Sequence, residues 1–194
     1  SYIMCKGMNR SFFNVILGGF GATEDTANKS IKEHFKLKEH AQNDFPNSIK
    51  KISEILIQAL SNENKLMWCG NGGSAAQAEH LSAELLGGLN RKKIEPFFSL
   101  CLNTDPSFIT AWSNDSSFEE IFSRQIEAFG NAGDILILLS TSGNSKNQII
   151  AAKKCQELGV KVVSFTGKDG GELKRLSDFN LNVESNSTQR IQEM

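Results

Sequence analysis

The sequence predicts an α/β fold: a doubly wound parallel sheet of five strands that follows an N-terminal helical hairpin. Three observations support this prediction. Beyond residue 64, short apolar runs alternate with segments rich in helix-forming residues. The run Ile135–Leu139 is apolar throughout, as is typical of a strand buried on both faces of a sheet. Turns rich in serine or glycine follow three of the runs, at the position where ligands bind on such sheets.

The alternation places each strand and helix of the sheet region. Each connection between strands contains a helix, and such crossovers make the sheet parallel and bring all strand carboxyl ends to one edge. The expected strands are Lys65–Cys69, Phe97–Leu102, Asp134–Ser140, Val160–Thr166 and Asp178–Val183. The expected helices are Ser74–Gly87, Pro106–Trp112, Phe118–Phe129, Lys146–Leu158 and Gly171–Leu176.

Two amphipathic helices, residues 26–42 and 46–60, are expected to form the N-terminal hairpin. Pro46 suits the first position of a helix, so we expect a break at Asn43–Pro46. The second helix carries an apolar stripe, Ile49–Leu60, whose members recur every three or four residues. Such a hairpin covers the sheet or packs against a partner chain. Because the stripe is continuous, we expect a second copy of the chain to bury it.

The composition limits the classes of function. The chain has 194 residues, enough for one domain with a sizeable core. Its 21 basic and 22 acidic residues leave a net charge of −1, which argues against a nucleic-acid partner. It has no apolar run long enough to span a membrane, so no membrane partner is expected. The four cysteines form no metal-spaced pair, which favours buried free thiols in a reducing, cytoplasmic setting.

Residues 1–25 do not share the pattern of the rest and are expected to be an unrelated or poorly ordered leader. Residues 1–24 resemble a segment of the membrane nicotinamide nucleotide transhydrogenase β subunit, the one that joins its last membrane helix to its soluble nucleotide domain. That segment carries no active site. The stretch Ser11–Ala22 also imitates a signal peptide, but its asparagine and three glycines make a poor signal core.

The turn Gly70–Ser74 lies between the first strand and a strong helix, with Ser74 placed as the helix N-cap. Glycines let backbone N–H groups approach a ligand, and the helix dipole favours negative charge there, so this turn suits an anion. The same stretch fits the dinucleotide fingerprint loosely, as Gly70-x-Gly72-x-x-Ala75. That alternative needs an acidic residue after the second strand, where Asp105 is only a loose match.

A second motif, Ser140–Ser145, follows the third strand and opens the helix at Lys146. Four hydroxyls and several N–H groups meet at one helix N-terminus, which suits a phosphate monoester better than a simple cap, for which one serine suffices. A third motif, Thr166–Gly171, has two equally favoured interpretations: it completes the ligand cleft, or it only forms a turn. Asn114 and Asp115, expected in a loop, form a plain turn or accept a substrate hydroxyl.

His80 and Glu84 lie four residues apart and therefore share one helix face just beyond the glycine turn. Such pairs are often modest surface interactions. The phosphate-type turn before them and the otherwise apolar face favour a functional role. A glutamate can move protons between adjacent carbons, and histidine with glutamate can also bind zinc.

These motifs, in this order and followed by Arg190–Glu193, resemble the sugar isomerase (SIS) superfamily, and within it the phosphoheptose isomerases. The resemblance covers residues 28–194. It implies a flavodoxin-like sheet and conversion of D-sedoheptulose 7-phosphate to D-glycero-D-manno-heptose 7-phosphate through an enediol, for lipopolysaccharide heptose synthesis. Members are cytoplasmic homotetramers that share sites between subunits, and many bind zinc, here expected as one ion per subunit.

The resemblance also assigns roles to individual residues. Glu84 would be the catalytic base, and His80, Glu84 and Gln192 would bind the metal. The family has a further catalytic histidine eight residues after Gln192, whereas this chain ends at Met194, so the domain 26–194 is expected to stop before the last helix. The residues implied to bind the substrate are Asn71, Gly72, Gly73, Ser74, Asp115, Ser140, Thr141, Ser142, Ser145 and Gln192.

Two other interpretations stay open at this point. One is a non-catalytic binding protein of the replication-initiator-associating branch, which shares the turns but lacks the catalytic glutamate. The other is a phosphosugar-sensing domain of a regulator, although no DNA-binding region accompanies it. Glu84 favours the enzyme.

Overall fold

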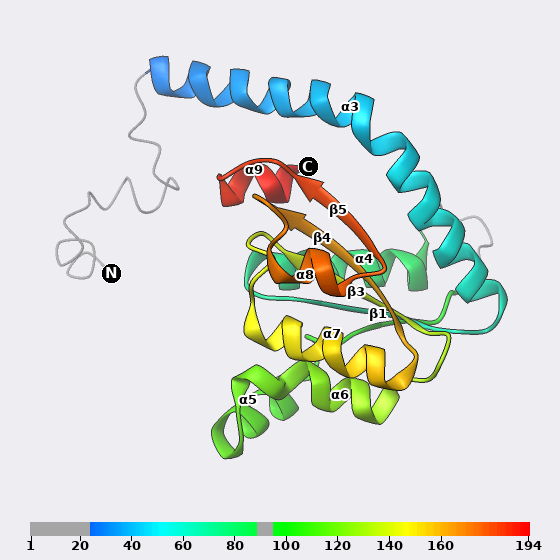
Figure 1. Ribbon diagram of the computed structural model, residues 1–194. Coiled ribbons are helices and arrows are strands. Elements are labelled where there is room, and N and C mark those ends of the chain that lie inside the picture. Colours follow the sequence, from blue (N-terminus) through cyan, green and yellow to red (C-terminus); the bar gives the residue numbers. More distant parts are fainter. Residues whose placement is uncertain (1–23, 89–94) are drawn as a thin grey trace. The chain divides into compact units, whose positions relative to one another are not determined.

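The computed structural model describes residues 24–88 and 95–194 (Figure 1). The chain divides into two units, residues 1–40 and residues 41–194. The described part of the first unit is the beginning of helix α3 (Glu24–Ser61), and the second unit contains the sheet. The predicted leader, its transhydrogenase resemblance and its imitation of a signal peptide lie outside the described residues, except for the last two leader positions, which open α3.

The predicted N-terminal hairpin is wrong, because α3 is one helix of 38 residues with Pro46 inside it. An interior proline removes one backbone hydrogen bond and costs about 3 kcal/mol. Packing after Pro46 offsets this cost, since Ile52 and Ala59 are buried against Trp68 and other residues of the sheet. Part of the apolar stripe is therefore covered by the chain itself. Ile49 and Ile57 remain exposed.

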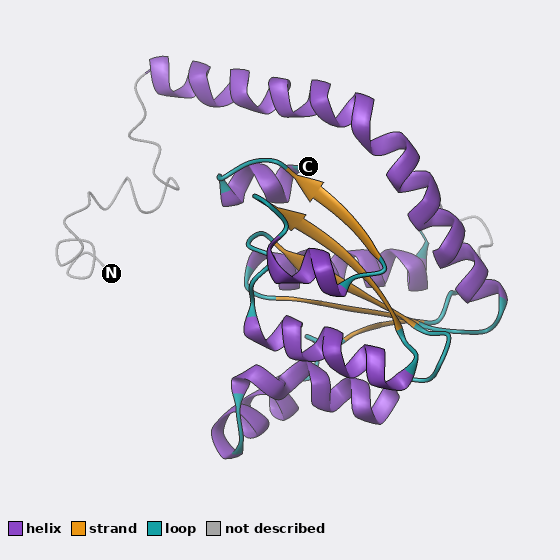
Figure 2. Cartoon of the chain, in the orientation of Figure 1, coloured by secondary structure: helices purple, strands orange, loops and turns teal. Residues whose placement is uncertain are grey.

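The sheet has five parallel strands in the order β2-β1-β3-β4-β5, as the alternation of apolar runs and helices predicts (Figure 2). The strands are β1 (Leu66–Gly70), β2 (Ser99–Cys101), β3 (Ile135–Ser140), β4 (Lys161–Gly167) and β5 (Phe179–Val183). All five predicted strands are present. The second is shorter than predicted: Phe97 and Phe98 come before β2 and are exposed, and the buried Leu102 follows it.

The helices match the predicted positions closely, and only Phe118–Phe129 is divided, into a 3-10 turn followed by α6. They are α4 (Gly73–Gly87), α5 (Pro106–Asp115), η1 (Phe118–Glu120), α6 (Ile121–Phe129), α7 (Lys146–Leu158), α8 (Gly171–Leu176) and α9 (Thr188–Glu193). None of the described helices is long and apolar enough to cross a lipid bilayer.

Strand β3 divides the core into two layers. Leu136 and Leu138 pack with buried residues of α6, α7 and α8, whereas Ile135, Ile137 and Leu139 pack with residues of α3 and α4. Successive side chains of a strand point to opposite faces, so an apolar run with helices on both sides is buried at every position. The core therefore holds the strand ends in place on both faces of the sheet.

The cysteines Cys69, Cys101 and Cys155 are free and buried, as predicted for the part of the chain that the structure describes. Burial raises the pKa of the Cys155 thiol to about 12 and raises the pKa of the Cys69 thiol well above its usual value. Burial also raises the pKa of the Cys101 thiol, against an opposing hydrogen bond from Asn103. These thiols are neutral packing groups of the core.

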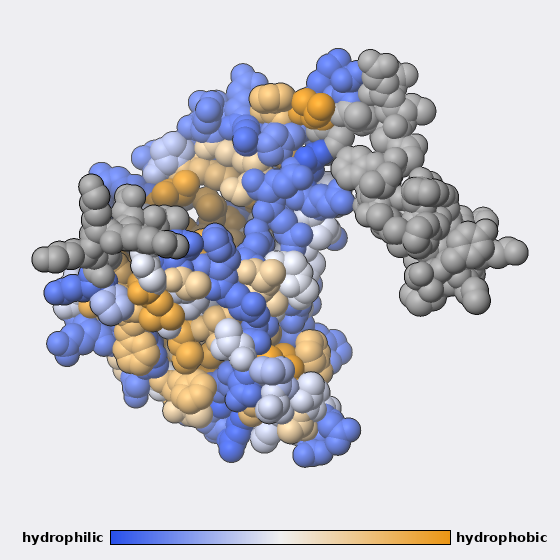
Figure 3. Space-filling model, turned by 180° about the vertical axis from the view of Figure 1, so that it is seen from behind, coloured by the Kyte–Doolittle hydropathy of each residue, from blue (hydrophilic) through white to orange (hydrophobic). Residues whose placement is uncertain are grey.

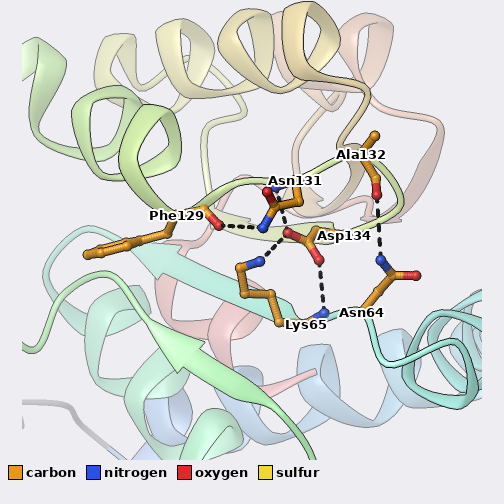
Figure 4. Close-up of polar contacts among 6 residues, drawn as sticks. All are labelled: Asn64, Lys65, Phe129, Asn131, Ala132 and Asp134. Carbon is orange, nitrogen blue, oxygen red and sulfur yellow. Dashed lines mark hydrogen bonds and ion pairs between the residues drawn. The ribbon is translucent and has the colours of Figure 1, made fainter.

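A buried ion pair joins β1 and β3 where the two strands begin (Figure 4). The ammonium of Lys65 contacts the carboxylate of Asp134, whose Oδ1 also accepts a hydrogen bond from the backbone N–H of Lys65 at 3.0 Å. The backbone N–H of Asn131 donates to Asp134 Oδ2 at 2.7 Å. The side chains of Lys65 and Asp134 are only 8% and 2% exposed. This charge pair lies at the edge opposite the motif-bearing turns.

Candidate active site

The glycine turn begins at the end of β1. Gly72 has φ +58° and is the N-cap of α4, so the prediction that Ser74 caps this helix is wrong. The chain needs a left-handed residue to enter the helix here, and Ser74 instead lies buried in the first turn. No side chain caps that turn, which leaves it open to an anion. A Cβ at Gly70 would overlap the backbone of Ser74, so the turn also requires glycine there.

The serine-rich loop begins at the end of β3 and leads to Ser145, the N-cap of α7, whose side chain makes no capping hydrogen bond. Ser140 Oγ accepts a hydrogen bond from the backbone N–H of Gly143 at 3.2 Å and lies 3.4 Å from Ser145 Oγ. Ser142 Oγ accepts from the backbone N–H of Asn144 at 3.1 Å. These hydroxyls shape the loop and meet at the start of a helix whose dipole favours an anion.

The third motif packs against this loop. Gly143 has φ +65°, and a Cβ there would overlap the carbonyl of Gly170. Asn144 Oδ1 accepts a hydrogen bond from the backbone N–H of Glu172 at 3.0 Å, and Thr166 lines the same pocket as Ser140. The third motif therefore packs against the serine-rich loop and contributes Thr166 to the pocket, in addition to forming a turn.

A pocket of about 240 Å³ lies between the ends of β3, β4 and β5 and helices α4 and α9. It brings together three of the predicted substrate-binding hydroxyls, those of Ser74, Ser140 and Thr141, with the side chain of Gln192. Its other lining residues are Phe45, Gln77, Leu81, Leu139, Phe165, Thr166, Leu181, Val183, Ile191 and Met194. The pocket is thus polar where the turns meet and apolar elsewhere.

Gln192 reaches the glycine turn because α9 docks on the end of β4. A Cβ at Gly167 would overlap Ile191, which shows how closely α9 approaches. Gln192 Nε2 donates to Ser74 Oγ at 3.4 Å, and Gln77 Nε2 donates to the carbonyl of Gln192 at 2.8 Å. The structure therefore places the side chain of Gln192 beside Ser74.

The pair His80 and Glu84 lies farther along α4. His80 Nε2 and Glu84 Oε1 are 4.0 Å apart, with the histidine side chain 71% and the glutamate side chain 30% exposed. Glu84 lines a second, apolar groove of about 530 Å³ between α3, β1 and α4, and does not line the pocket at Ser140. Glu84 follows Ser74 by ten residues, or about 15 Å of helix. Within one chain, the proposed base and the serine-rich loop therefore line different cavities, which share only Leu81.

The histidine and glutamate fit two positions of a zinc site, and Gln192 as placed does not. Ligands of tetrahedral zinc lie about 3.4 Å apart, so a small side-chain rotation brings His80 and Glu84 to one ion. The side chain of Gln192 contacts Ser74, six residues or about 9 Å of helix before His80. Across the described ranges, no three side chains of histidine, cysteine, aspartate or glutamate come together as a metal cluster.

Two acidic residues stand apart from the pocket. Asp115 is the last residue of α5, so the prediction that Asn114 and Asp115 lie in a loop is wrong: the helix continues through both. Asp115 is exposed, and its Oδ1 accepts from Asn114 Nδ2 at 2.7 Å. Asp105 is the N-cap of α5 and accepts from the backbone N–H of Phe108 at 2.9 Å. A capping role explains Asp105 without a dinucleotide.

Sequence reasoning missed three side chains that hold this region, because their partners are distant in the chain. Gln77 contacts Gln192, and Asn147 contacts Asn71. Asn103 accepts from the backbone N–H of Gly70 at 3.1 Å and donates to its carbonyl at 2.9 Å. An asparagine directly after a predicted strand was the only signal available for Asn103.

Comparisons with known proteins decide the family. Residues 31–167 match the family model described as the SIS domain. The phosphoheptose isomerase of Helicobacter pylori strain P12 is 44% identical over 173 residues, which make up 88% of each chain. The chain belongs to the SIS domain family, among the phosphoheptose isomerases.

Solved structures of phosphoheptose isomerases have the same fold. The enzyme of Neisseria gonorrhoeae matches with a TM-score of 0.82 at 38% identity, over 88% of this chain and 90% of that one. The enzyme of Francisella tularensis matches with a TM-score of 0.84 at 32% identity, over 87% and 90%. As a member of the phosphoheptose isomerases, the chain is a phosphosugar isomerase, and the dinucleotide interpretation of the glycine turn is superseded.

Proposed function

We propose that this chain converts D-sedoheptulose 7-phosphate to D-glycero-D-manno-heptose 7-phosphate, a step toward lipopolysaccharide heptose. The observation that carries the proposal is the serine-rich loop at the start of α7, which meets Ser74 and Gln192 in one pocket. The phosphate binds this loop, where hydroxyls and a helix N-terminus favour an anion. The direct test follows the carbon-labelled ketose by NMR with the purified chain, and absence of the aldose contradicts the proposal.

The reaction needs one base and two adjacent carbons. Glu84 removes a proton from C1 of the ketose while the C2 carbonyl oxygen gains a proton, and the enediol forms. Returning a proton to C2 while the C1 hydroxyl loses one gives the aldose. Asn71 and the glycine turn hold the sugar end.

Because Glu84 and the serine-rich loop line different cavities of one chain, we propose that the site is completed between subunits of a homotetramer. The support is an apolar surface near Glu84. The groove that it lines also contains Ile57, Leu60, Leu85 and Phe97, and Ile57 is 63% exposed. Figure 3 shows hydrophobic residues gathered on the face of the molecule seen from behind. A cytoplasmic location is part of the same proposal, because sugar phosphates of this kind are made inside the cell.

We also propose one zinc ion per subunit, bound by His80 and Glu84. Gln192 joins them only if its side chain turns away from Ser74. When bound, such an ion polarises a carbonyl oxygen of the substrate. Proton transfer at carbon remains the task of Glu84.

Replacing Ser142 and Ser145 by alanine is expected to weaken binding of the phosphate ester by about ten- to hundredfold, since hydrogen bonds to a charged group contribute roughly 1.5–3 kcal/mol. Calorimetry with sedoheptulose 7-phosphate and with unphosphorylated sedoheptulose measures the effect. Ser107→Ala, at an exposed position of α5 that does not line the pocket, is the control and should change neither affinity. Equal losses for both sugars would exclude a phosphate role for the loop.

Replacing Ile57 by aspartate is expected to dissociate the oligomer, because a charge would enter an apolar interface. Ile57 is the suitable position, since Ile52 is buried in the chain's own core and Leu56 packs against it, so charges there would damage the fold. Sedimentation velocity measures the assembly, with the exposed Glu54→Gln as control. A monomeric unaltered chain would contradict the proposed assembly.

A further inference from the structure

Two asparagine side chains connect the glycine turn to the helix that follows the serine-rich loop. Asn71 Nδ2 donates to Asn147 Oδ1 at 2.9 Å, and Asn147 Nδ2 donates to Asn71 Oδ1 at 2.9 Å. Asn71 directly follows Gly70, the last residue of β1, and Asn147 is the second residue of α7, two residues after Ser145. The pair therefore bridges the two turns that the proposed substrate would contact at its two ends.

The two side-chain amides differ in the hydrogen-bonding positions that remain available to a ligand. An amide has two N–H donors and an oxygen that accepts two hydrogen bonds, so the reciprocal pair uses one donor and one acceptor position of each. Asn147 is 3% exposed and is enclosed by the protein. Asn71 is half-buried and keeps a second donor and a second acceptor position. The pair thus determines which way the amide of Asn71 faces.

The backbone beside Asn71 is held separately. Asn103 bonds both the N–H and the carbonyl of Gly70, from the loop after β2. This contact fixes the end of β1 but leaves the side chain of Asn71 to rotate. In the part of the chain that the structure describes, the side-chain amide of Asn71 is hydrogen-bonded by Asn147.

We propose that Asn147 is a positioning residue of the active site, which orients the Asn71 amide and sets the spacing between the glycine turn and the serine-rich loop. The proposal rests on the proposed function, in which Asn71 contacts the sugar and the loop binds the phosphate. Asn147 acts through Asn71 and does not touch the substrate. Its loss should misplace the sugar end while phosphate binding persists.

The test compares Asn147→Leu, which keeps the side-chain size and removes both hydrogen bonds, with Asn147→Asp, which replaces the donor by an acceptor facing Asn71 Oδ1. Both variants are expected to lower kcat for sedoheptulose 7-phosphate by about ten- to hundredfold, as misplacement of about 1 Å does. The inhibition constant of inorganic phosphate should change less than about twofold. Ile149→Val is the control in α7, because it loosens packing without touching the pair, and its kcat should stay close to that of the unaltered chain.

An unchanged kcat in both Asn147 variants would overturn the proposal, and so would equal losses of kcat and phosphate binding, which indicate general damage. If the unaltered chain does not convert the ketose, the proposed function fails on its own. In that case the positioning role is tested by NMR of the side-chain amide signals. Adding sedoheptulose 7-phosphate should shift the Asn71 Nδ2 signals in the unaltered chain and not in Asn147→Leu, and equal shifts in both would overturn it.

Discussion

Glu84→Gln is expected to lower turnover of sedoheptulose 7-phosphate by about two to four orders of magnitude, the usual contribution of a general base. Glutamine keeps the shape of glutamate but cannot take a proton from carbon, so substrate affinity should change little. The measurement is exchange of the substrate C1 proton with deuterated solvent, followed by NMR. Because Glu84 is also a proposed zinc ligand, part of the loss should be recovered with excess zinc if it reflects lost metal.

Glu79→Gln is the matched control, since Glu79 is exposed on the same helix and should leave exchange unchanged. A second experiment tests whether the site is shared. Mixed assemblies of Glu84→Gln chains with Ser142→Ala, Ser145→Ala chains should regain activity, because some sites then combine an intact base with an intact phosphate loop. Proton exchange at the unaltered rate in Glu84→Gln would falsify the assignment of Glu84 as the base.

Asp134→Ala is expected to lower the free energy of unfolding by about 3–5 kcal/mol, the usual cost of removing one partner from a buried ion pair. The ammonium of Lys65 would stay buried without its partner, and the backbone N–H groups of Lys65 and Asn131 would each lose an acceptor (Figure 4). Urea unfolding followed by circular dichroism measures the change. Catalysis should be affected only through stability, because this pair lies at the edge of the sheet opposite the serine-rich loop.

Two comparisons make the Asp134 prediction specific. Glu127→Ala breaks the half-exposed pair of Arg124 with Glu127 and should cost less than about 1 kcal/mol. Lys65→Met combined with Asp134→Leu removes both charges together and should recover much of the lost stability, since apolar replacements of buried ion pairs are often close to neutral. A loss in Asp134→Ala no larger than that in Glu127→Ala would contradict a structural role for the buried pair.

The alternation of apolar runs and helix formers was enough to predict the parallel sheet and most of its helices. The run Ile135–Leu139 has no polar position, so only burial on both faces satisfies it, and the structure places helices on both faces. Helix α7 begins at Lys146 as predicted, directly after the Ser140–Ser145 motif. The family was predicted from the resemblance of the ordered motifs to the SIS superfamily, and the match of residues 31–167 to the SIS domain confirms it.

Contacts between distant parts of the chain decided the rest. Pro46 signals a helix start by local preference, but burial of Ile52 and Ala59 against the sheet outweighs the lost hydrogen bond and keeps α3 continuous. The joining of Asn71 with Asn147, across 76 positions, depends on how two turns meet at the sheet edge. The separation of Glu84 from the serine-rich loop likewise follows from the direction of α4. Local sequence determines which elements form, whereas tertiary packing determines which side chains meet. The free energy of contacts between distant residues is gained only once the elements pack together.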